Sequence, residues 1–122
     1  MAEVTEGKYA GEFIASEANG TRSRETVIIA AGQNIIAAQV LGKVTASGMY
    51  AAFDQDGADG TEVAAGIAFD SYDASSADVN GVALLRDAEV NGNDLLWPAD
   101  IEVAEQAAAK AELAALGIIV RI

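Results

Sequence analysis

Residues 48–69 read GMYAAFDQDGADGTEVAAGIAF, and this stretch decides the fold. Two short apolar runs, YAAF and EVAAGIAF, flank a connection with three aspartates, one glutamate and two glycines in ten residues. The flanking runs have the length and composition of strands. Asp-Gly pairs supply the positive φ angles that tight connections between strands require. The stretch therefore predicts two strands joined by an acidic turn.

A calcium loop is the main alternative for the same acidic residues. The EF-hand template needs oxygen ligands at positions 1, 3 and 5, glycine at 6 and glutamate at 12. Counted from Asp54, these last three positions hold Ala58, Asp59 and Ala65, and counted from Asp56 position 5 is Gly60. We therefore interpret the stretch as a turn and expect no metal and no cofactor. A carboxylate pair for glycoside hydrolysis stays open, although the sequence identifies no cleft beside it.

Short strand-like segments also surround this stretch, over residues 26–97. They include TVIIA (26–30), NIIAAQVLGKV (34–44) and GVALLRDAEV (81–90), each followed by a cluster of Gly, Asn, Asp or Ser. Strands of this length with such turn signals indicate a compact β unit. The segment LGKVT (41–45) is not a phosphate loop, because Val44 stands where Ser or Thr is required.

A helix is predicted over about residues 100–116, DIEVAEQAAAKAELAAL, where strong helix formers dominate. Asp100 is the expected N-cap and Gly117 the expected C′ residue, with one more β segment over residues 118–122. On a wheel of 100° per residue one side carries no charge, and we expect it to pack against a sheet. This alanine face consists of Val103, Ala104, Ala107, Ala108, Ala111, Ala114 and Ala115.

The amino-acid composition limits the kinds of functional site that the chain can form. At 122 residues it is one domain, with 52% hydrophobic residues and no histidine or cysteine. Zinc sites of the usual kind and Ser/His or Cys/His nucleophiles are thereby excluded. The net charge of −12 disfavours direct binding to nucleic acid or to anionic membranes. No membrane-spanning run or signal-peptide pattern is visible, so we expect synthesis in a cytoplasm-like compartment.

Residues 1–25 differ from the rest of the chain. The segment is polar, rich in Glu and Gly, and has too little apolar material to form a core of its own. In an extended strand, Tyr9 and Phe13 share one face and Ile14 lies on the other. Such a segment is suited to adding a strand to the exposed sheet edge of a neighbour. An ordinary disordered tail, or a strand paired within its own subunit, is the alternative.

The order of these motifs resembles the head decoration protein family of lambda-like tailed phages. The resemblance runs from about Val27 to the C-terminus, through QVLGKVT, ADGTEVAAGI, VALLRDAEV, LLWPADI, the Ala-rich helix and LGIIVRI. It implies a mainly β, β-clip-like domain of short strands over residues 26–122 with one C-terminal α-helix. The extended N-terminal arm of residues 1–25 precedes this domain.

The resemblance also implies a function. Family members are structural proteins, not enzymes, and sit as homotrimers on the outer surface of the virion head at three-fold positions. There they bind the major capsid protein and stabilise the expanded, DNA-filled shell, after synthesis in the host cytoplasm. For the capsid-binding arm we single out Val4, Tyr9, Phe13 and Ile14, and for the trimer interface Trp97 and Pro98.

One departure limits what the resemblance transfers. Members can have a leading segment rich in Pro, Ser and Thr, whereas Pro98 is the sole proline here. The capsid contacts of the arm are therefore not carried over residue by residue. Two other functions stay open: a virion-surface module that binds a host surface or glycan, and a carboxylate enzyme on a related scaffold. The first predicts an exposed aromatic cluster, and no such cluster is visible in the sequence.

Overall fold

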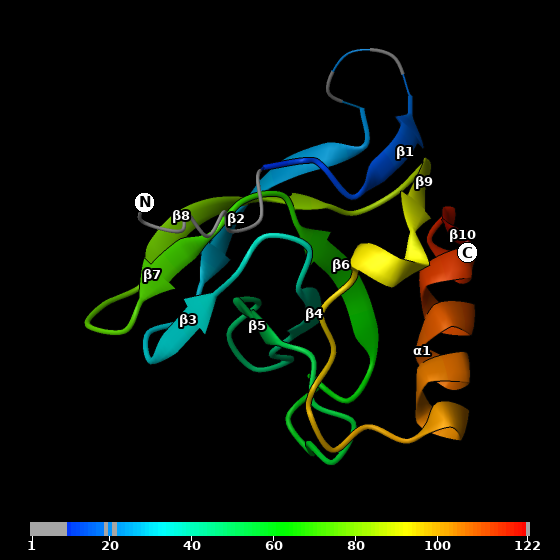
Figure 1. The fold of residues 1–122 in the computed structure, drawn as a ribbon. Coiled ribbons are helices and arrows are strands. Elements are labelled where there is room, and N and C mark those ends of the chain that lie inside the picture. Colours follow the sequence, from blue (N-terminus) through cyan, green and yellow to red (C-terminus); the bar gives the residue numbers. More distant parts are fainter. Residues whose placement is uncertain (1–9, 19, 21, 122) are drawn as a thin grey trace, which may run out of the picture.

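The computed structural model describes residues 10–18, 20 and 22–121, and the chain is mainly β with one C-terminal helix, as predicted (Figure 1). Among these residues no helix is long and apolar enough to cross a membrane. The elements are β1 (Ile14–Glu17), β2 (Arg24–Ile29), β3 (Gln33–Ile35), β4 (Val40–Lys43), β5 (Tyr50–Ala52), β6 (Ala64–Ala68), β7 (Tyr72–Ala74), β8 (Val79–Leu84), β9 (Ala88–Asn91), η1 (Gly92–Asp94), α1 (Val103–Ala115) and β10 (Ile118–Arg121).

A closed barrel of five strands forms the centre, in the order β2-β5-β4-β6-β8. Its longest pairing joins β2 and β8, antiparallel from Arg24↔Leu84 to Ile29↔Val79. The barrel closes where β2 meets β5 in parallel at Ile29↔Tyr50. Closure leaves no free edge within the barrel, which removes the template for strand-by-strand aggregation there.

Two smaller sheets extend from the barrel. Strands β1, β9 and β10 form one, with β1 antiparallel and β10 parallel to β9. Strands β3 and β7 form the other. The larger hydrophobic core joins the barrel to the β1-β9-β10 sheet and to α1. Its fully buried members include Phe13, Ile67, Val90, Leu113 and Ile118.

The helix begins later than its sequence indicated. Its N-cap is Glu102, not Asp100, and Glu102 forms a capping box with Glu105, whose carboxylate accepts a hydrogen bond from the Glu102 N–H at 3.0 Å. Asp100 instead accepts a hydrogen bond from the side chain of Gln55. Gly117 follows the helix with φ of 87°, which confirms the expected C′ residue.

The alanine face of α1 does not pack against the sheet, so this expectation was wrong. The helix turns Ala109 and Leu113 inward, and these are its buried residues. The carboxylate of Glu112 also lies on the inner side and accepts a hydrogen bond from the N–H of Ala64 at the start of β6, at 3.0 Å. These inward contacts fix the rotation of the helix about its axis. They leave the alanine face exposed. The helix itself runs along one flank of the molecule (Figure 1).

Candidate functional site

The acidic stretch at residues 53–62 connects β5 and β6, and the predicted turn is confirmed. Its carboxylates accept hydrogen bonds from the stretch's own backbone: Asp54 from the N–H of Asp56 at 3.0 Å, Asp59 from that of Thr61 at 3.2 Å. Asp59 also accepts from the Thr61 hydroxyl at 2.6 Å, and these bonds lower the pKa of the Asp59 carboxyl. The acidic side chains thus serve the geometry of the turn.

Removal of divalent metal should therefore leave the protein unchanged. Within residues 10–18, 20 and 22–121, no group of three or more Asp, Glu, His or Cys side chains is placed to hold a metal ion. We expect calcium or EDTA to leave the melting temperature unchanged, because ligand that binds only the folded state would raise it. A shift of several degrees with EDTA would contradict this, and Asp59→Asn would then show whether the turn is the site.

Where this turn meets the start of α1, two carboxyl groups approach each other. The side-chain amide of Gln55 donates to Asp100 at 3.0 Å and lies 3.5 Å from a carboxylate oxygen of Asp56. Desolvation, followed by the negative charges of Asp100, Glu105 and Asp54, raises the pKa of the Asp56 carboxyl. The hydrogen bond from Gln55 is the main cause that lowers the pKa of Asp100. Ionisation of Asp56 therefore destabilises the folded state, whereas ionisation of Asp100 does not.

Asp56→Asn should raise the melting temperature at pH 7. Because the folded state raises the pKa of Asp56, the wild-type protein is penalised when this group is ionised, and the penalty disappears as pH falls through the raised pKa. The advantage of the variant should shrink accordingly in melts between pH 7 and pH 4.

Asp73→Asn is the control of opposite sign. The Ser75 hydroxyl and then its N–H lower the pKa of Asp73, so its charged form stabilises the fold above the unfolded-state pKa. This variant should melt lower at pH 7, and its deficit should fade as pH falls through the depressed pKa. Equal effects of the two variants would contradict the assignment.

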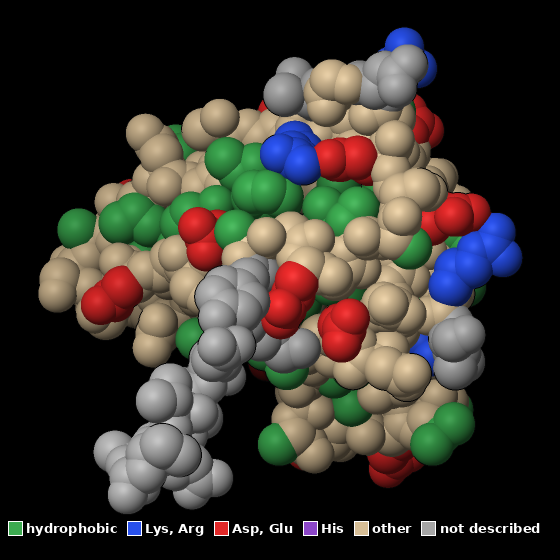
Figure 2. All heavy atoms as spheres, turned by 45° about the horizontal axis from the view of Figure 1, so that its top comes forward, with side chains coloured by type: hydrophobic (Ala, Val, Ile, Leu, Met, Phe, Trp, Pro, Cys, Tyr) green, Lys and Arg blue, Asp and Glu red, His purple; other side chains and the backbone are tan. Residues whose placement is uncertain are grey.

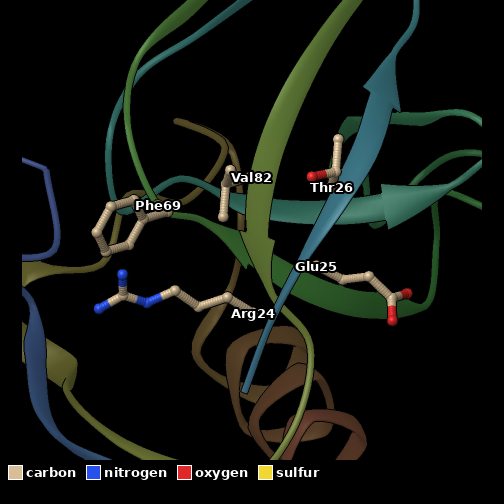
Figure 3. A pocket seen from close by; sticks show the side chains of 5 residues that line it. All are labelled: Arg24, Glu25, Thr26, Phe69 and Val82. Atoms are coloured by element: carbon tan, nitrogen blue, oxygen red, sulfur yellow. The ribbon is translucent and has the colours of Figure 1, made fainter. Parts of the chain in front are cut away.

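The N-terminal part of the described chain contacts the barrel beside an open pocket of about 340 Å³. The pocket is lined by Arg24, Glu25, Thr26, Phe69 and Val82. The Arg24 side chain extends toward Phe69 (Figure 3), and its guanidinium carbon lies 4.1 Å from the ring centroid. The same guanidinium pairs with Glu17 of β1, with 3.1 Å between Nε and the carboxylate. Because one cation contacts both the residue that follows barrel strand β6 and a strand outside the barrel, we call this group the N-terminal junction.

Gly11 completes the N-terminal junction. Its N–H donates to the carbonyl of Phe69 at 3.0 Å, and its φ is +71°. A Cβ at this position would stand 2.8 Å from the Phe69 ring, so the close approach requires glycine. No local sequence motif indicates Gly11, Arg24 and Phe69, because residues distant in sequence come together here.

The four residues singled out for the arm fall into two groups. Val4 and Tyr9 lie outside the described residues. Phe13 is fully buried in the larger core, and Ile14 is half-buried where β1 pairs with β9. The Phe13 ring therefore fills the interior of its own subunit in this structure.

The two residues singled out for the trimer interface are half-buried. The Trp97 ring meets the Phe53 ring edge-on, with centroids 6.1 Å apart and an interplanar angle of 83°. The preceding residue, Leu96, donates from its N–H to Ala38 at 3.0 Å, which holds this segment against the barrel. Trp97 and Pro98 each leave part of their surface open to a neighbour.

Basic groups do not gather on the face shown in Figure 2, where acidic side chains are spread over the surface. Three arginines of the described chain pair with carboxylates of the same subunit, namely Arg24 with Glu17, Arg86 with Glu25 and Arg121 with Glu89. Phosphate recognition needs basic groups that are free to neutralise charge.

These features define a small acidic β-barrel protein. The family model of the bacteriophage lambda head decoration protein D matches residues 3–118. The chain belongs to this family, and it is a structural component of a phage capsid. A comparison with curated proteins finds no match.

Proposed function

We propose that the protein binds the outer surface of the phage head at three-fold positions, as a homotrimer of β-clip-like domains, and stabilises the expanded, DNA-filled shell. The family match over residues 3–118 carries this proposal, because it spans nearly the whole chain. The net charge of −12 supports it, since such a protein faces capsid protein and solvent and avoids the genome.

For the capsid contact we propose the N-terminal arm, residues 1–25, with two roles along its length. Val4 and Tyr9, upstream of the N-terminal junction, contact the major capsid protein. Phe13 and Ile14 hold the arm to its own domain, in keeping with their burial and with the pairing of β1. A segment anchored at one end loses less freedom on binding than a free peptide, which favours capture of a distant sheet edge.

For the trimer we propose that the open parts of Trp97 and Pro98 lie in the subunit interface. Large aromatic side chains at symmetric interfaces contribute much of the binding energy. The ring of Trp97 is already oriented by Phe53, so little rotamer freedom remains to be lost on association.

Co-sedimentation with capsids of the protein's own phage tests the function. Purified protein should pellet with expanded heads and not with unexpanded ones, and added protein should reduce DNA loss from filled heads on heating. Protein that stays in the supernatant with expanded heads would refute capsid decoration. Binding to host cells in the same assay would instead favour a virion-surface binding module.

A further inference from the structure

The orientation of α1 is the reverse of that expected for a helix at the surface of a single subunit. Surface helices normally bury their apolar side and expose their charges. Here the alanine face is exposed, with Val103 at 87% exposure, whereas Glu105, Lys110 and Glu112 are half-buried. The alanine face is therefore not buried within the described part of one subunit.

The inner contacts show that this orientation is specific to the fold. Leu113 and Ala109 fill the core, and Glu112 is the hydrogen-bond acceptor for the N–H that begins β6. Rotating the helix to bury the alanine face would remove Leu113 from the core and leave the Ala64 N–H without this partner. Either loss destabilises the fold, because it leaves a cavity in the core or a backbone N–H without its partner. The alanine face therefore stays outward while the subunit keeps this fold.

Further exposed apolar residues lie close to the helix. Leu116 and Ile119 are 39% and 41% exposed at its C-terminal end, and Val63, directly before β6, is 47% exposed. At 13 residues the helix is about 20 Å long, and a strip about 10 Å wide covers about 200 Å². A stable interface buries about 800 Å² per partner, so the helix needs these neighbours and the adjoining 97–98 segment to complete one.

The charges around the alanine face indicate what covers it. Copies of a chain with net charge −12 repel each other, and the repulsion is least where neither copy presents a charge. On the helical wheel, Lys110 borders one edge of the face, and Glu105 and Glu112 border the other. When parallel helices are arranged around a rotation axis, the lysine edge of each copy meets the glutamate edge of the next. Small side chains let such helices approach to about 8 Å.

We propose that the alanine face of α1 is a contact between copies of this chain, arranged by rotation so that Lys110 of one copy faces the Glu105 and Glu112 edge of the next. The inference rests on the proposed homotrimer and assigns a surface to it. It extends the interface from Trp97 and Pro98 along the connection 99–102 to the whole length of α1.

A double variant, Ala107→Glu with Ala111→Glu, tests the contact by placing charge at its centre. Light scattering should give about three times 12.5 kDa for wild type and 12.5 kDa for the variant, a threefold loss of mass. Glutamate is a good helix former, so circular dichroism should show the helix retained. The matched control is Ala77→Glu in the exposed connection between β7 and β8, which should keep the wild-type mass.

The outcomes separate the inference from the proposed trimer. A double variant that keeps the wild-type oligomeric mass would overturn the alanine-face contact and leave the trimer standing. A monomeric wild-type protein would overturn both. Should the double variant misfold, Ala111→Cys decides, since the chain contains no cysteine. Oxidation should then cross-link copies through Ala111→Cys and not through Ala77→Cys, and equal absence of cross-links would overturn the inference.

Discussion

Deletion of residues 1–9 should abolish binding to capsids and leave the domain folded. Among the described residues, the N-terminal junction includes Gly11 and the pair of Arg24 with Glu17, and Phe13 lies in the core beside it. The deletion keeps these residues. It removes Val4 and Tyr9, the proposed capsid contacts. Because three linked arms raise one another's effective concentration, losing them together should weaken apparent capsid affinity by about 10²-fold or more.

Three measurements on the deletion variant give the answer: its melting temperature, its mass in solution and its occupancy on expanded heads. We expect the first two to match wild type and the third to collapse. Tyr9→Ala is the companion variant, and it should reduce occupancy in part. Full occupancy by the deletion variant would refute the arm, and a loss of mass in solution would show that these residues hold the oligomer together.

A longer deletion, of residues 1–25, does not test the same idea. It removes Phe13, which is fully buried, together with β1 and Arg24. Loss of a buried phenylalanine side chain alone costs about 3–5 kcal/mol, a large part of the usual total stability of 5–15 kcal/mol. Such a variant should fail to fold, so its absence from capsids would be uninformative.

Local patterns predicted the strands well where neighbouring residues decide the backbone, and less well where one residue interrupts a run. The run expected over 34–44 is divided into β3 and β4, because Ala38 between them adopts φ of 74°. The run over 81–90 is similarly divided into β8 and β9 at Asp87, with φ of 52°. Neither residue is a glycine, so composition gave no sign of the break. Barrel closure depends on the pairing of distant strands and was not predictable from a single run.

The helix illustrates the same limit. Its sequence correctly predicted two faces, one uncharged and one charged, but not which face turns inward. Within α1, Leu113 is the one large apolar residue near the charged side, and burying it brings Ala109 and Glu112 inward as well. A wheel that counts only apolar residues favours the seven members of the alanine face over one leucine. The larger side chain and the hydrogen bond to β6 determine the outcome.

Gly42→Ala should be among the most damaging single changes in the chain, because the acidic turn folds back onto this glycine. Gly42 lies in β4 and pairs with both Ala51 of β5 and Ala64 of β6. A Cβ on Gly42 would stand 2.5 Å from the Cα of Thr61 and 2.6 Å from its carbonyl oxygen. These are backbone atoms, and the Thr61 carbonyl also accepts the N–H of Asp54 at 3.0 Å.

The added methyl group therefore has to displace the 53–62 connection, or break the hydrogen bond that joins this connection to β4 through Phe53 and Val40. Overpacking of this kind costs about 3 kcal/mol or more, and we expect the melting temperature to fall by roughly 10 °C. Gly32→Ala is the matched control, because its φ of +91° is strained but no atom lies within 4 Å of the new Cβ. It should cost only about 1–2 kcal/mol. Equal losses from the two variants would contradict the approach of the acidic turn as the reason for glycine at position 42.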